Sequence, residues 1–216
     1  MTLTNQPNYQ PTLATAWEMY RTSKDHAHNL DHITTVLDNA VKIAREMPNT
    51  VDLRMLGYAV VLHDIAREQD FVAGTDTHEI VGAGLSYHYT QGKFTEGEQD
   101  MIADAILNHR NSTGKPETML AKIVADADRI PASSMEYITR TFMYNFCKFG
   151  DIDVAVNNGY ASLCRKYRDN DPVMHTKAGI AIVKPMLDRM RREIKTVSDY
   201  RNLANKFIGF SGLQGV

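Results

Sequence analysis

Apolar residues recur every three or four positions along most of the chain, which is the period of an amphipathic α-helix. In the clearest run, Val36, Ala40 and Ile43 fall on one face, and Pro48 ends the run. Four further runs with the same period predict helices at residues 53–63, 75–91, 95–109 and 117–128. Thr95 and Glu98 have the spacing of a capping box, which marks a helix start.

Beyond Ile130–Pro131 the expected helices become rich in Tyr and Phe. One long helical segment is expected from about His175 to Phe207. Pro185 should either kink this segment or mark its start, because proline disrupts a helix interior.

No stretch alternates apolar and polar residues for long enough to require a sheet. Gly, Thr, Asn and Ser predict loops at residues 67–75 and 109–117. We therefore predict an all-α protein with a core over residues 1–131 and a C-terminal helical extension over residues 132–216, packed on the same domain.

The composition is that of an ordinary globular protein, with 43% hydrophobic and 23% charged residues among 216. The 24 basic and 26 acidic residues give a net charge of -2, so nucleic acid is not expected as a bulk ligand. No apolar run approaches the roughly 20 residues that cross a membrane, and no signal peptide is evident at the N-terminus. We expect a cytoplasmic protein without a membrane partner. Its two cysteines, Cys147 and Cys164, cannot form a Cys-rich zinc site.

Histidine has an uneven distribution, since seven of the eight histidines lie between residues 26 and 109. Several of them, with two aspartates, fall at helix ends or on inward faces, where an unpaired polar group is costly. These positions are His28, His32, His63, Asp64, His78, His109 and Asp128. A divalent cation would satisfy them, because imidazoles and carboxylates bind first-row metals.

The ordered set His32, then His63-Asp64 in AVVLHDIARE, then Asp128 in KIVADADRI resembles the H…HD…D signature of the HD-domain superfamily of metal-dependent phosphohydrolases. The resemblance covers roughly residues 20 to 131. It implies a bundle of about five core helices and one ion bound by those four residues.

His78 in THEIVGAG and His109 in ILNHR resemble the additional histidines of superfamily members that hold two ions. The resemblance implies that Asp64 bridges to a second ion held by these histidines. The ions would be Mn, Fe, Co, Ni, Zn or Mg. Alternatively, His78 is an exposed residue in a first helical turn and His109 is a helix-terminal residue favoured by the dipole, which leaves a single-metal site.

The segment HNLDH, from His28 to His32, resembles the H-N-x-x-H segment of cyclic-nucleotide phosphodiesterases. This resemblance implies that His28 is the general acid that protonates the leaving oxygen. The alternative is a surface histidine in the first turn of a helix.

Positive charge is needed where a phosphoryl group gains negative charge in the transition state. Arg67, three residues after Asp64, matches a position where many family members are basic, and it is a candidate for catalysis and substrate binding. Arg110 and Asn29 are further candidates for substrate binding, although Asn at a helix end often serves only as a cap.

The resemblance implies hydrolysis of a phosphomonoester or phosphodiester, of a nucleotide or a related small phosphorylated metabolite, by metal-activated water. The sequence has neither a glycine-rich phosphate loop nor a G-x-S-x-G motif. Diiron oxygenases of the superfamily share the ligand order, and a nucleotide-binding regulatory domain without turnover is a third alternative. The extension could cover the site, select the substrate or form the interface of a homodimer.

Overall fold

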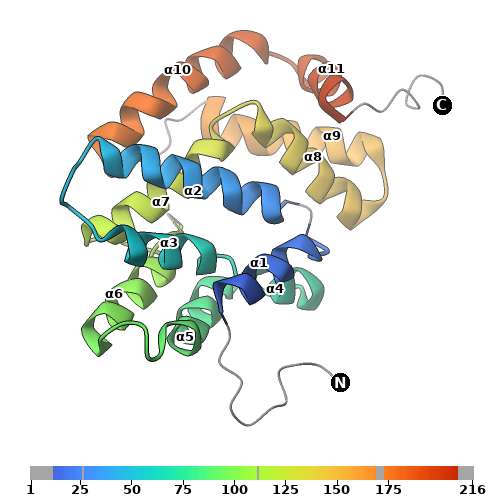
Figure 1. Cartoon of the computed structure of the whole chain (residues 1–216). Helices are drawn as coiled ribbons and strands as arrows, with labels where there is room; N and C mark the ends of the chain where they lie inside the picture. The colour runs from blue at the N-terminus through green and yellow to red at the C-terminus, as the bar shows by residue number, and fades with distance from the viewer. Residues whose placement is uncertain (1–11, 26, 111, 169–172, 209–216) are drawn as a thin grey trace. The chain divides into compact units, whose positions relative to one another are not determined.

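A computed structural model describes residues 12–25, 27–110, 112–168 and 173–208, and every regular element in these ranges is helical (Figure 1). The predicted all-α fold is thus confirmed. The chain divides into two compact units, Met1–Ala127 and Asp128–Val216, and the division falls inside helix α7 (Met119–Ala132). None of the described helices is both long enough and apolar enough to cross a membrane.

Helix α3 (Leu53–Leu62) is the central helix of the first unit. It packs against four others, namely α1 (Leu13–Arg21), α2 (Leu30–Arg45), α5 (His78–Thr90) and α6 (Glu96–Leu107). Because Leu56, Val60, Val61 and Leu62 are all buried, the helix is apolar around most of its circumference. The chain therefore leaves α3 inside the unit, so the two residues that follow, His63 and Asp64, are buried as well.

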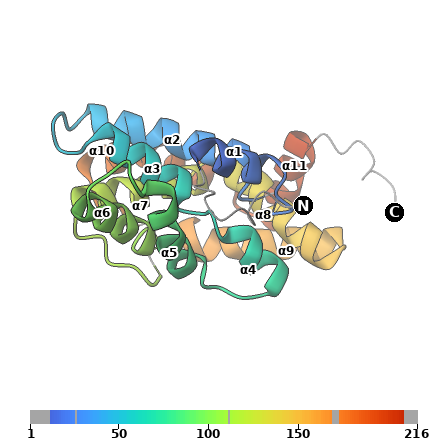
Figure 2. The ribbon, with the colours of Figure 1, turned by 60° about the horizontal axis from the view of Figure 1, so that its bottom comes forward.

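Two other helices of this unit, α2 and α6, begin with side-chain caps. Asn29 accepts hydrogen bonds from the backbone N–H groups of Asp31 and His32 and starts α2 earlier than the apolar pattern indicated. Thr95 and Glu98 form the predicted capping box of α6. Helices α5 and α6 lie side by side, as Figure 2 shows.

Two elements of the first unit differ from the sequence prediction. Helix α1 was not predicted, and α4 (Arg67–Ala73) occupies most of the expected loop at residues 67–75. Helix α4 has only seven residues, about two turns, which is too short to display a helical period in the sequence. It ends at Gly74, whose φ of 69° is left-handed.

The second unit is built on α8 (Glu136–Phe149) and α9 (Ile152–Leu163), which pack together and are joined through Gly150 in the left-handed conformation. Helix α9 continues into a π-helical turn, η2 (Cys164–Arg168). Tyr200, from α11 (Val197–Ile208), packs on both helices, and its hydroxyl donates to the Ile138 carbonyl oxygen at 3.0 Å.

The long segment expected from His175 to Phe207 is two helices, α10 (Lys177–Glu193) and α11. The break lies at Lys195–Thr196, where the Asp199 carboxylate accepts both backbone N–H groups and starts α11. Pro185 lies inside α10, so the expectation that it might begin the helix was wrong.

Candidate metal centre

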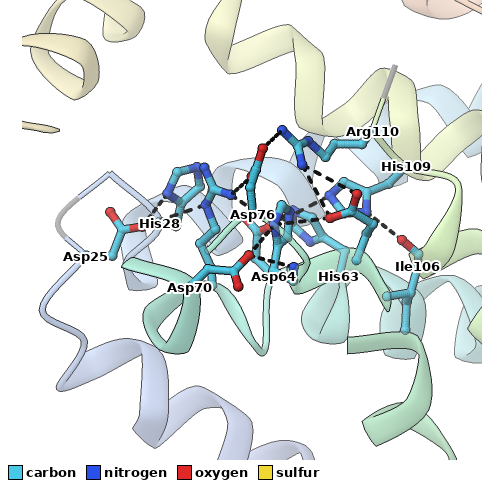
Figure 3. A network of polar contacts seen from close by, with 12 residues as sticks. Asp25, His28, His63, Asp64, Asp70, Asp76, Ile106, His109 and Arg110 are labelled. Carbon is cyan, nitrogen blue, oxygen red and sulfur yellow. Dashed lines mark hydrogen bonds and ion pairs between the residues drawn. The ribbon is translucent and has the colours of Figure 1, made fainter. Parts of the chain in front are cut away.

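Four histidines surround the Asp64 carboxylate in the first unit. Nε2 of His32 and of His63 lies 3.5 and 3.3 Å from Asp64 Oδ2. Nε2 of His78 and of His109 lies 3.4 and 3.8 Å from the other oxygen, Oδ1. Each carboxylate oxygen thus faces one pair of imidazoles, and all five side chains are buried (Figure 3 labels three of them).

The ends of four helices bring these side chains together. His32 lies in the first turn of α2, and His63 and Asp64 form the turn directly after α3. His78 is the first residue of α5, and His109 follows the last residue of α6 by two positions. Residues separated by up to 77 positions, the difference between 32 and 109, therefore share one site.

The hydrogen bonds of the outer ring nitrogens orient two of the imidazoles. Nδ1 of His63 donates to the Val60 carbonyl oxygen at 2.7 Å, and Nδ1 of His109 donates to the Ile106 carbonyl oxygen at 2.6 Å. Because a carbonyl oxygen only accepts, each Nδ1 carries the hydrogen, and Nε2 of the neutral ring carries its lone pair toward Asp64.

This arrangement fits a cation. A lone pair on Nε2 and an anionic oxygen repel each other unless positive charge lies between them. Burial alone would raise the pKa of Asp64, but the surrounding imidazoles of His63, His28 and His32 hold it well below its usual range. The ligand atoms of His32, His63 and Asp64 lie within 4.8 Å of one another, as do those of Asp64, His78 and His109. Such nitrogen and oxygen sets suit first-row divalent metals.

His28, the predicted general acid, lies at the edge of this centre. Its Nδ1 is 2.8 Å from Oδ2 of the buried Asp25, and its ring contacts the His32 ring edge-on, with centroids 5.5 Å apart (Figure 3 shows the contact with Asp25). Burial lowers the pKa of His28 to about 4, against the raising effect of the Asp64 and Asp25 carboxylates.

The two arginines that were predicted to bind substrate, Arg67 and Arg110, also lie beside the metal centre. Nη1 of Arg67 is 2.9 Å from Nδ1 of His78, and Arg67 and Arg110 both form ion pairs with Asp76. A hydrogen bond from Arg110 lowers the pKa of Asp76.

The Asn29 side chain caps α2, as described above, and its substrate-binding role stays a prediction. Asp128 lies on α7 as the first residue of the second unit. The roles assigned to the other residues also stay predictions; the structure establishes which of their side chains lie together.

Sequence reasoning missed three buried carboxylates that support the centre: Asp25, Asp70 and Glu79. Asp25 precedes His28 by three residues and Glu79 follows His78, so proximity in the sequence could have suggested both. Asp70 is not close in the sequence to any predicted histidine or aspartate of the centre, so its sequence position did not suggest it. Asp70, Asp76 and His78 could also hold a cation by their geometry, but hydrogen bonds from Thr75, Thr77 and the backbone N–H of His78 already occupy both oxygens of Asp70.

The helix ends of this all-α unit place four histidines around one buried aspartate. The unit is therefore a helical domain whose imidazole and carboxylate groups can hold a metal ion. Residues 29–133 match the family model described as the HD domain, which confirms the resemblance seen in the sequence.

A solved structure supports the same assignment. The chain is similar to a predicted HD superfamily hydrolase from an uncultured Thermotogales bacterium, with 28% sequence identity and a TM-score of 0.52 over 71% of this chain and 85% of that one. The comparison with curated proteins gave no match. The family and this neighbour together support the general class of metal-dependent hydrolases.

Proposed function

We propose that the protein hydrolyses phosphate esters, either phosphomonoesters or phosphodiesters, of a nucleotide or a related small phosphorylated metabolite. The observation that carries the proposal is the division of four imidazoles between the two oxygens of Asp64, with Arg67 and Arg110 close by. The imidazoles and carboxylate suit metal ions, and the guanidinium groups suit a phosphate.

Two ions fit the donor set. His32, His63 and Asp64 would hold the first, and Asp64, His78 and His109 the second. We assign Asp128 as a further ligand of the first ion, because it lies within the matched HD domain and follows the buried Val124 by about one turn of α7. When bound, such ions lower the pKa of water and polarise phosphoryl oxygens.

The remaining residues supply the proton for the leaving oxygen and stabilise the negative charge of the phosphoryl group. The Asp25 carboxylate holds Nδ1 of His28 at 2.8 Å, which directs the opposite side of the ring away from Asp25. His28 takes up a proton on Nε2, favoured by the nearby Asp64 and Asp25 carboxylates, and passes it to the leaving oxygen. Arg67 and Arg110 bind phosphoryl oxygens of the substrate, and their positive charge helps to stabilise the negative charge that develops on the reacting group.

The test combines metal analysis with a panel of phosphate esters. The freshly purified protein is analysed for metal by mass spectrometry, and phosphate release is measured with Mn, Co, Ni, Zn and Mg in turn. Asp64→Ala should lose both ions and all turnover, and His63→Ala should lose the first ion and turnover. His88→Ala is the matched control, because His88 is an exposed histidine on α5.

Full activity of Asp64→Ala after removal of adventitious metal would exclude the proposal. Iron in the purified protein together with oxygen consumption would instead establish an oxygenase. Metal and nucleotide binding without any product would establish a regulatory domain.

A further inference from the structure

One exposed carboxylate joins the two arginines beside the metal centre. Oδ1 of Asp76 is 3.4 Å from Nη1 of Arg67, and Oδ2 of Asp76 is 2.8 Å from Nη2 of Arg110 (Figure 3 labels Asp76 and Arg110). The Asp76 side chain is 62% exposed, whereas the two arginine side chains are only 22% and 25% exposed. The carboxylate therefore contacts the arginines from the solvent side.

Buried carboxylates hold the same arginines from the protein side. Nε of Arg67 is 3.9 Å from Oδ2 of Asp25, and Nη1 of Arg110 is 3.4 Å from Oε1 of Glu79. Glu79 also accepts a hydrogen bond from the Thr113 hydroxyl at 3.0 Å. The guanidinium groups consequently keep their places when Asp76 turns away.

Asp76 belongs to an exposed segment between α4 and α5, in which residues 73 to 77 are all exposed. An ion pair at such a position contributes little to stability, because solvent screens it. A phosphoryl group has more charge and more oxygens than a carboxylate, and two guanidinium groups can bind it through several parallel hydrogen bonds. Such a ligand can displace the Asp76 carboxylate.

Arg67 of this pair lies one imidazole ring away from the Asp64 carboxylate. Nδ1 of His78 contacts Arg67, and Nε2 of the same ring faces Asp64. A ring that binds an ion through Nε2 keeps its hydrogen on Nδ1, and Asp70 and Glu79 oxygens lie 3.3 and 3.4 Å from Nδ1 to accept it. The Arg67 guanidinium is then left to bind an anion.

We propose that Arg67 and Arg110 form a phosphate subsite that Asp76 fills in the absence of ligand. Provided that the protein is a phosphohydrolase, as proposed above, its substrate carries a second phosphoryl group besides the one that reacts. Asp76 then acts as an internal competitor for this second group.

The first experiment measures binding of inorganic phosphate to the full chain by isothermal titration calorimetry, without any requirement for turnover. Asp76→Asn keeps the shape of the side chain and removes its charge. We expect the dissociation constant to fall roughly threefold to tenfold, the effect of removing one or two surface ion pairs. The double variant Asp76→Asn/Arg110→Gln should lose this gain.

Asp100→Asn is the matched control, because Asp100 is another exposed aspartate, with Tyr87 rather than an arginine as its partner at 2.8 Å. It should leave phosphate binding unchanged. Unchanged or weaker phosphate binding in Asp76→Asn would overturn the subsite, and so would a gain that persists in the double variant.

The second experiment compares kcat/KM for substrates with one and with two phosphoryl groups. Asp76→Asn should lower KM for the second kind by a similar factor, and this decrease should be larger than any change in KM for the first kind. A gain in phosphate binding without hydrolysis of any ester would retain the subsite and refute the proposed function. Hydrolysis of esters with no preference for a second phosphoryl group would retain the function and refute the substrate assignment.

Discussion

Replacing Asp70 should separate the two halves of the metal centre. Asp70 is a buried residue of α4 whose Oδ2 accepts the backbone N–H groups of Thr77 and His78, both at 2.6 Å. Its Oδ1 accepts the hydroxyl of Thr75 at 2.5 Å. These bonds fix the start of α5, where His78 faces Asp64.

Asp70→Ala leaves two backbone donors without their acceptor. A hydrogen bond to a charged group contributes about 1.5 to 3 kcal/mol, so the two together contribute about 3 to 6 kcal/mol. Since the adjoining residues 73 to 77 are exposed, water can replace part of these hydrogen bonds. We therefore expect the free energy of unfolding to fall by about 3 kcal/mol. Asp70→Asn keeps one oxygen that can accept both N–H groups, so its free energy of unfolding should fall by only about 1 kcal/mol.

Urea denaturation followed by circular dichroism and metal content per chain are the two assays. With a slope of about 3 kcal/mol per molar urea, the midpoint of Asp70→Ala should fall by about 1 M. The same variant should lose the second of the two proposed ions, at His78 and His109, and keep the first, at His32 and His63. Equal stability of the Ala and Asn variants, or an unchanged metal content in Asp70→Ala, would refute this reasoning.

Three further predictions concern packing, pH and capping. A Cβ at Gly159 would lie 2.1 Å from the Tyr200 hydroxyl, so Gly159→Ala should lower the melting temperature, whereas Gly84→Ala, with nothing within 4 Å, should raise it slightly. Burial raises the pKa of Tyr200, so the stability that its protonated form contributes is present below about pH 10 and is lost as the pH rises further; Tyr200→Phe should show a smaller fall in stability above that pH in urea titrations. Asn29→Ala should cost about 1 kcal/mol of unfolding free energy and loosen His32 at the start of α2, whereas Asn29→Asp keeps the cap; denaturation and metal affinity measure the two effects.

The helical period was readable in the sequence because it depends on short-range spacing, and the ordered histidines were readable because they resemble a known signature. Val36, Ala40 and Ile43 are all buried on α2, as their period indicated. The resemblance to HD proteins then selected which of the scattered histidines to bring together. His32, His63 and His78 could be paired with Asp64 only through that resemblance, since periodicity gives no distance between helices.

The remaining features depend on tertiary contacts that leave little trace in the sequence. Asp70 is one aspartate in a polar stretch, and its hydrogen bonds to Thr77 and His78 exist only once the segment after α4 has folded back. The end of α10 was missed because Asp199 reaches back to Lys195, a contact that overrides the apolar period continuing through both helices. The partnership of Arg67 and Arg110 depends on Asp76, which the sequence presented only as part of the start of the helix expected at residues 75–91.

The two histidines that follow α3 and α6 show why helix ends suit this metal centre. The last four carbonyl groups of a helix have no partner within it. His63 and His109 each donate Nδ1–H to the carbonyl three residues earlier, Val60 and Ile106, which satisfies that oxygen and fixes the ring at the same time. The hydrogen is thereby held on Nδ1, and the lone pair on Nε2 is directed to opposite oxygens of Asp64. The same local arrangement, used on two helices, thus places one imidazole Nε2 beside each oxygen of the Asp64 carboxylate, so a single side chain both satisfies a backbone carbonyl and offers a nitrogen to the candidate metal centre.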